Sequence, residues 1–275
     1  MRGHIAVAAL VLGGCYQSSL PAIEAAPAID AAVVAPDALA PTHAGLVFVA
    51  PQSNAPGTVV GARFGPGSLA SLEREALAPG CRLRDLTSHC ALVTCTSYFP
   101  TESAGTLHVT LRGTETFDAS VVTEPRVAGQ DSLYGGSGPA VLQAGDAVTV
   151  SADGAIVPAF ALTATAPTAI DPDTFPWPAA LSRSHDLVLS WPPGDADRVD
   201  VILSAVPYTN ELVWCIWSGT PATTTVEAAA LAVLPESGDV LIGVDAIRTQ
   251  TMVVGDYVIE LEVASQASIL YPVMP

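Results

Sequence analysis

The sequence predicts an all-β protein with two β-sandwich domains. Short apolar or alternating runs recur from Leu46 onward, and clusters of Gly, Pro, Asp and Ser separate them. Half of the 275 residues are apolar and 13% are charged, which is ample material for a folded core. Because the strands follow at short intervals without intervening helices, we expect immunoglobulin-like sandwiches and not βαβ units.

The first fifteen residues predict export. Arg2 precedes an apolar run over 5–12 and the quartet Leu12-Gly13-Gly14-Cys15, which together have the plan of a signal peptide over residues 1–14. The apolar run is far shorter than the roughly 20 residues of a transmembrane helix. The quartet resembles the lipobox of bacterial lipoproteins, and this resemblance implies that Cys15 is acylated after cleavage. An ordinary signal peptide with an incidental Cys15 is the alternative.

Residues 15–43 predict a disordered, extended tether, because they are rich in Ala and Pro and contain no Lys or Arg. Tyr16 follows the cysteine. In lipoproteins of Gram-negative bacteria an Asp at this place resembles an inner-membrane retention signal, so its absence favours the outer membrane. We therefore expect an exported protein that is held on the lipid bilayer of the cell envelope by acylated Cys15.

The remaining chain divides into two sets of expected strands, with a Pro-rich boundary over 166–178. Those of the first domain, 44–168, lie near 46–50, 59–64, 91–96, 106–112, 147–151 and 159–165. Those of the second domain, 169–275, lie near 187–191, 199–205, 212–217, 240–246 and 257–264. Imperfect alternation in the last strand predicts a bulge or register break near Glu260. Short helices are expected over 68–77 and 226–234.

A series of short motifs resembles a known group of proteins. They are, in order, Cys81, Cys90 and Cys95, then Ala104-Gly105-Thr106, Gly145-Asp146-Ala147-Val148-Thr149-Val150, Val157-Pro158-Ala159-Phe160 and Asp186-Leu187-Val188-Leu189-Ser190-Trp191. This order is similar to that of uncharacterised exported lipoproteins of myxobacteria, over most of the mature chain. The resemblance implies the cell-envelope address and the β-sandwich fold, and it implies no chemistry.

Four cysteines remain after Cys15, and export makes disulfides the expected state of Cys81, Cys90, Cys95 and Cys215. Cys90 and Cys95 would project from opposite faces of one strand, so Cys81 should bond with one of them. The Cys81–Cys90 pair is favoured. Cys215 either bonds with the remaining cysteine or lies in the core as a small hydrophobe.

Few residues are candidates for ligand binding. The carboxylates of Asp195, Asp197 and Asp200 could attract calcium, but the EF-hand order is absent and a solvated acidic loop is favoured. The cysteine spacings match no zinc pattern, so we expect no metal and no cofactor. Trp177, between two prolines, is the aromatic residue most suited to face a ligand, whereas Trp191 is expected in the core.

Catalytic and nucleic-acid functions are disfavoured. The sequence contains no G-x-S-x-G elbow and no H-E-x-x-H helix, and Gly135-Gly136-Ser137-Gly138 is interpreted as a loop. A net charge of −17 would repel phosphates. We therefore expect a non-catalytic protein that binds an envelope protein. A carbohydrate- or peptidoglycan-binding protein and a hydrolase with an unrecognised site are the alternatives.

Overall fold

The fold is all-β, as predicted. The computed structural model describes residues 41–52, 56–69, 81–95, 101–123, 132–171, 173–191, 194–206, 211–219, 221–236 and 238–274. The predicted signal peptide, Cys15, nearly all of the tether and most of the helix expected over 68–77 lie outside these residues. Within them, no helix is long and apolar enough to cross a membrane.

The strands form one large sheet and a separate two-stranded sheet. The strands in the N-terminal part are β1 (His43–Pro51), β2 (Thr58–Pro66), β3 (Cys81–Asp85), β4 (Cys90–Cys95), β5 (Leu107–Leu111), β6 (Glu115–Thr123), β7 (Ser132–Gly138), β8 (Ala147–Ala152) and β9 (Phe160–Thr165). Those in the C-terminal part, with one helix, are β10 (Leu181–Ser182), β11 (Leu187–Ser190), β12 (Arg198–Val206), β13 (Glu211–Ser218), β14 (Thr223–Val226), α2 (Ala228–Leu231), β15 (Asp239–Val254) and β16 (Tyr257–Met274). The large sheet runs β3-β4-β13-β12-β15-β16-β1-β2-β7-β6-β5-β8-β9, whereas β11 pairs with β14.

The first core lies between β1, β2 and β5–β9. The alternation predicted for 106–112 is confirmed, because Leu107, Val109 and Leu111 are fully buried in this core. Phe64 packs edge-to-face on Tyr134, with ring centroids 5.7 Å apart.

The glycine run at 135–138 is part of strand β7 and not a loop. A Cβ atom on Gly138 would lie 2.3 Å from the Phe117 ring, and one on Gly136 would lie 2.6 Å from the Asp118 carbonyl oxygen. Glycine therefore lets β6 pack closely against β7. A glycine-rich composition, which is typical of a turn, here allows two neighbouring strands to approach closely.

The second core lies between one face of β4, β13, β12, β15 and β16 and a cover made of β11, β14 and α2. Trp191 is buried in it, as predicted, with its ring stacked near Phe175 at a centroid distance of 6.2 Å. The apolar run expected to form a helix over 226–234 contributes only the single turn of α2. The two-stranded β11–β14 sheet and α2 thus cover one face of the large sheet and complete a second sandwich-like unit.

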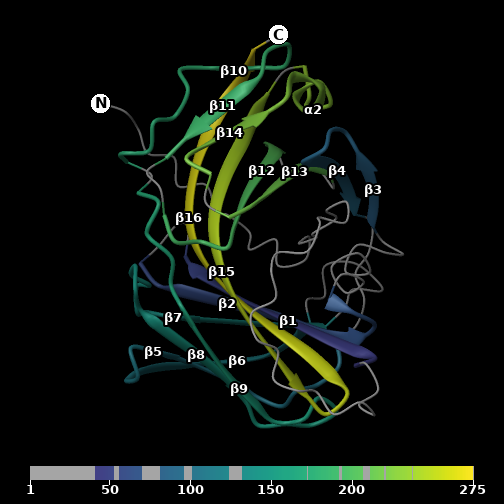
Figure 1. Ribbon diagram of the computed structural model, residues 1–275, viewed down its shortest axis with the longest axis vertical. Coiled ribbons are helices and arrows are strands. Elements are labelled where there is room, and N and C mark those ends of the chain that lie inside the picture. The colour runs from purple at the N-terminus through teal and green to yellow at the C-terminus, as the bar shows by residue number, and fades with distance from the viewer. Residues whose placement is uncertain are drawn as a thin grey trace.

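One hairpin, β15–β16, spans both cores (Figure 1). Its register is continuous from Asp239 opposite Pro272 to Val254 opposite Tyr257, so the break predicted near Glu260 is wrong. Gly255, with φ of +56°, and Asp256 form the two-residue turn between the strands. Both strands are much longer than the expected 240–246 and 257–264.

Each core draws strands from both sides of the boundary predicted near residue 168. Ile259, Leu261 and Val263 of β16 pack in the first core, where β16 pairs in parallel with β1. Conversely, β4 pairs with β13, and Cys90 belongs to the second core. The long hairpin and β4 therefore cross between the ranges 44–168 and 169–275.

Candidate functional site

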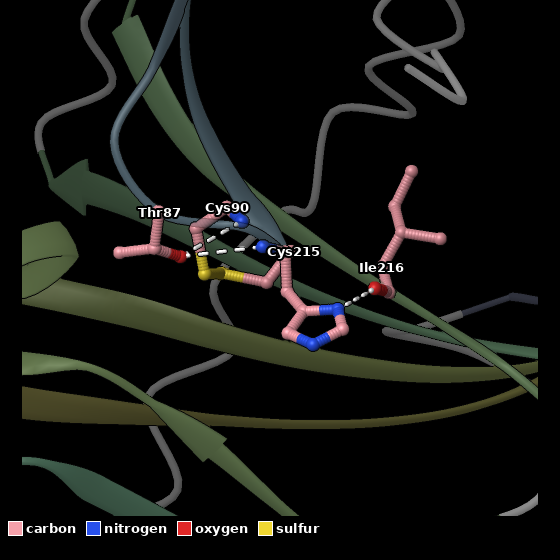
Figure 2. The surroundings of a disulfide bond; sticks show 5 residues. Thr87, Cys90, Cys215 and Ile216 are labelled. Carbon is pink, nitrogen blue, oxygen red and sulfur yellow. Dashed lines mark hydrogen bonds between the residues drawn. A yellow bond between two sulfur atoms is a disulfide. The ribbon is translucent and has the colours of Figure 1, made fainter. Parts of the chain in front are cut away.

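The disulfide observed in the described residues joins Cys90 of β4 to Cys215 of β13 (Figure 2). The two residues are directly opposite in the β4–β13 register, with Cα atoms 4.0 Å apart and 125 positions apart in the sequence. The Thr87 hydroxyl oxygen accepts hydrogen bonds from the amides of His89 and Cys90 and thereby holds the turn before β4. The bond fixes β4 to the sheet of the second core.

The favoured Cys81–Cys90 pair is therefore wrong. The sequence favoured a pair that is near in the chain and left Cys215 for the remaining cysteine, whereas β4 meets β13 through a contact that spans 125 residues. Cys81 stands opposite Cys95 in the β3–β4 register. The inference that Cys90 and Cys95 do not bond to each other agrees with the observed Cys90–Cys215 bond.

The three aspartates predicted as an acidic ligand-facing loop are separated by the fold. The Asp195 carboxylate accepts hydrogen bonds from the amide and hydroxyl of Thr168 and lies 3.2 Å from Arg248 Nη2, and these contacts lower its pKa. Asp197 accepts a hydrogen bond from the Thr249 amide. Both are exposed, whereas Asp200 is fully buried in β12. Asp200 therefore does not face a ligand in solution.

Trp177 is half-buried and not free for stacking on a sugar. Its ring centroid lies 4.2 Å from that of Phe175, and it packs against the second core. Its flanking prolines indicated a turn, but the same turn folds the indole back onto the sandwich. Of the predicted ligand-facing residues, Asp195 and Asp197 remain on the surface.

Asp200 belongs to a group of four charged residues on the face of the sheet opposite the second core, of which the three carboxylates are fully buried and Arg198 is partly buried. Asp200 stands directly opposite Asp245 in the β12–β15 register, and both are fully buried. Arg198 Nε donates to Asp200 Oδ1 at 3.0 Å, and Arg198 Nη2 lies 2.9 Å from Glu262 Oε1. The Arg198 guanidinium thus contacts two of the three buried carboxylates, and its single positive charge can neutralise only one of them.

Burial raises the pKa of Asp200 to about 7. This value is the net result of burial and the nearby charges of Glu262 and Asp245, which raise the pKa, and of Arg198, which lowers it. Asp200 Oδ2 has no hydrogen-bond partner in the part of the chain that the structure describes. No group of three His, Cys, Asp or Glu side chains there is arranged to hold a metal ion.

A hydrolase of the common kind would pair a histidine base with a hydroxyl nucleophile on one side and a carboxylate on the other. His108 lies between two carboxylates, with Nδ1 2.7 Å from Asp118 and Nε2 3.0 Å from Asp153. These contacts raise the pKa of His108 and lower that of Asp153. Since both ring nitrogens contact acids, His108 of β5 links Asp118 of β6 to Asp153, which follows β8.

Two other histidines meet hydroxyl groups at one nitrogen only. His43 Nδ1 lies 3.1 Å from Asp256 and 3.0 Å from the Thr42 hydroxyl. His185 Nδ1 lies 3.1 Å from the hydroxyls of both Ser182 and Ser184. Neither arrangement places a nucleophile and an orienting carboxylate on opposite ring nitrogens.

A groove of about 390 Å³ lies where the two cores meet. It is lined by Pro51 and Gln52 after β1, by Gln143 before β8, by the linker that includes Ile170, and by Gln266 of β16. Among the described residues that line it, Asp171 is the one carboxylate and there is no cationic side chain. This groove is the candidate functional site, because it is concave and combines apolar walls with a few polar groups.

The polar groups of the groove are suited to recognise a peptide backbone. The side-chain amides of Gln52, Gln143 and Gln266 make no hydrogen bond to any residue that the structure describes. The Ile170 amide donates to Ser265 Oγ at 2.7 Å, which fixes one wall. Each free amide offers both a donor and an acceptor.

Sequence reasoning missed this groove. Its walls come from four separate segments, and none of them carries a motif. The expected strand over 257–264 ended before Gln266, so this side chain was not considered. The run of Gln and Ser after Val263 was a weak signal, because a strand in the interior of a sandwich is expected to be apolar there.

Comparisons with known proteins assign no family to the chain. No family model matches it, and no curated protein matches it. Solved structures with some likeness include a two-domain fibronectin type-III segment of chicken tenascin, with 13% identity, 70% of this chain and 97% of that chain covered, and a TM-score of 0.25.

Two further structures have similar values. They are the FN1–FN3 domains of chicken CNTN1 (12% identity, 67% and 65% covered, TM-score 0.21) and a tetra-tandem repeat from the extending region of a large adhesion protein (11% identity, 81% and 74% covered, TM-score 0.19). Such TM-scores are too low to carry an argument about this chain.

Proposed function

We propose that this protein is an exported lipoprotein, anchored in the outer membrane through acylated Cys15, that binds another envelope protein without catalysing a reaction. The lipobox-like quartet before Cys15 and the Ala/Pro-rich residues up to 43 support the anchor and the tether. An anchored module of this kind holds its partner at a fixed place on the envelope.

The observation that carries the binding role is the groove between the two cores. Its free side-chain amides at Gln52, Gln143 and Gln266 surround apolar walls, a combination suited to a peptide segment. The catalytic alternative has less support, because the described histidines lack the geometry of a nucleophile and its base.

The glycan alternative needs exposed aromatic rings that lie in one plane beside polar groups. Trp177 packs on Phe175, and Trp191 is buried in the second core. None of the described residues that line the groove is aromatic. Protein is therefore the favoured partner class, and glycan is an outcome that the experiment can reveal.

The test is chemical crosslinking of the tagged protein on intact cells, followed by capture and mass spectrometry, with Cys15→Ala as the control. We expect one stoichiometric envelope protein that is lost when the anchor is removed. Capture of glycan alone, or of the same proteins with both chains, would contradict the proposed function.

A further inference from the structure

Strand β16 has an open edge between residues 264 and 272. On one side it pairs with β15 along its length from Tyr257 to Pro272. On the other side it pairs with β1 only as far as Val263 and with β10 only from Val273. No described strand occupies the interval, and this interval forms one wall of the groove through Ala264, Ser265, Gln266 and Ser268.

The register shows which backbone groups point toward the open side. The His43 amide donates to the Asp256 carbonyl, so the even-numbered residues of β16 direct their backbone groups toward β1. The Asp197 amide donates to the Ile247 carbonyl on the far side of β15, which agrees with this alternation. The N–H groups of Gln266, Ser268 and Leu270 therefore point into the open interval.

Prolines bound this interval at both ends. The parallel pattern would next require a donor from Pro51 to the Ala264 carbonyl, and proline has no N–H group, so the β1 ladder ends there. Pro272 occupies an outward-facing position where no donor is needed. Pro51 thus ends the pairing between β1 and β16 and leaves a short unpaired edge on β16.

The linker beside β16 contacts this strand through side chains and not through backbone pairing. The Ile170 amide donates to Ser265 Oγ, and the Tyr271 hydroxyl donates to the Pro178 carbonyl. Ser265 and Tyr271 are odd-numbered, so their backbone groups face β15. The linker therefore leaves the outward-facing groups of the edge unpaired.

We propose that the edge of β16 from Ala264 to Leu270 pairs with an extended, neutral or basic segment of the partner protein, which adds a strand in line with β1. This inference rests on the proposed function and names the mode of binding. Exposed edges recruit strands in this way, because backbone pairing supplies affinity and adjacent pockets supply side-chain selectivity. The groove carries the Asp171 carboxylate and no cation, and the chain has a net charge of −17, which disfavours an acidic segment.

The test uses a matched pair of variants at Ser268, an exposed position on the edge. Ser268→Pro removes one outward N–H group, whereas Ser268→Ala keeps that group and removes only the hydroxyl. Pairing with β15 does not use this N–H group, so both variants should keep the sheet. Circular dichroism verifies the fold of each.

The probe is a phage-displayed library of random ten-residue peptides, selected on the purified full-length chain. We expect enriched peptides to favour Lys and Arg over Asp and Glu and to slow hydrogen exchange at Gln266, Ser268 and Leu270. They should bind Ser268→Ala as they bind the parent, and bind Ser268→Pro about tenfold more weakly. Absence of enriched peptides, or protection at other amides, overturns the proposal even if Ser268→Pro does not fold.

Crosslinking on cells separates this inference from the proposed function. A partner captured equally by the parent and by folded Ser268→Pro would leave the interaction role intact and contradict the proposal that the β16 edge binds it. A partner lost with Ser268→Pro and kept with Ser268→Ala supports both.

Discussion

Asp200 illustrates how one carboxyl group can make the fold sensitive to pH. The side chain is fully buried, and the Arg198 guanidinium contacts the carboxylates of both Asp200 and Glu262. The ordinary pKa of 3.8 is raised to about 7 in the folded chain. The folded state therefore binds a proton over a range of pH in which the unfolded chain has already released it.

We predict that the free energy of unfolding decreases as pH rises from about 4 to about 7, by on the order of a few kcal/mol. At pH values above the pKa of Asp200 in the folded chain, this loss of unfolding free energy is complete. At pH values below its pKa in the unfolded chain, the loss is absent. Asp200→Asn should remove most of this slope, because the amide keeps the Arg198 hydrogen bond and does not titrate.

The measurement is urea unfolding between pH 4.5 and 8.5, with the exposed Asp173→Asn as a control that keeps the slope. Equal slopes for the parent and Asp200→Asn would contradict the raised pKa of Asp200.

The burial of Asp200 could not be predicted from the sequence. Its spacing from Asp195 and Asp197 indicated one polar loop. The loop stops at Arg198, where β12 begins, and alternation then turns Val199 and Val201 into the second core and Asp200 to the other face. A single sequence does not reveal that this other face is also covered.

At the scale of elements, local patterns predicted strands better than their lengths or partners. Alternation over 106–112 correctly predicted β5, whereas the glycines of β7 were interpreted as a loop. The length of β15 and β16 depends on two cores that share one hairpin. Such long-range pairing depends on tertiary packing and leaves no periodic signal in a short window.

The Cys90–Cys215 bond is expected to stabilise the attachment of β4 to β13. It closes a loop of 125 residues, so removing it gives the unfolded chain more freedom. We predict that the Cys90→Ala/Cys215→Ala double variant loses about 2–5 kcal/mol of unfolding free energy in guanidinium titrations.

Thr87→Ala is the matched control, because it removes two hydrogen bonds beside the disulfide and leaves the covalent bond in place. An unchanged unfolding free energy in the double variant would show that the bond does not stabilise the fold.

At the scale of the whole molecule, the β15–β16 hairpin couples the two cores. Ile242 is fully buried in the second core and Ile259 in the first, and both lie on this hairpin. We predict one cooperative unfolding transition, and each Ile→Ala change should lower its free energy by about 2–5 kcal/mol.

Tryptophan fluorescence tests this coupling, because all four tryptophans lie between residues 177 and 217. Ile259→Ala should lower the fluorescence midpoint although its side chain packs in the other core. An unchanged midpoint, with early exchange of β5 amides, would mean that the cores unfold separately.

We propose that the protein works from a lipid anchor at Cys15, and the intact mass of the mature protein tests this proposal most directly. We predict a chain that begins at Cys15 and carries two or three acyl chains, and that Cys15→Ala yields no acylated form. A mature chain without acyl groups, or one that begins elsewhere, would contradict the anchored account.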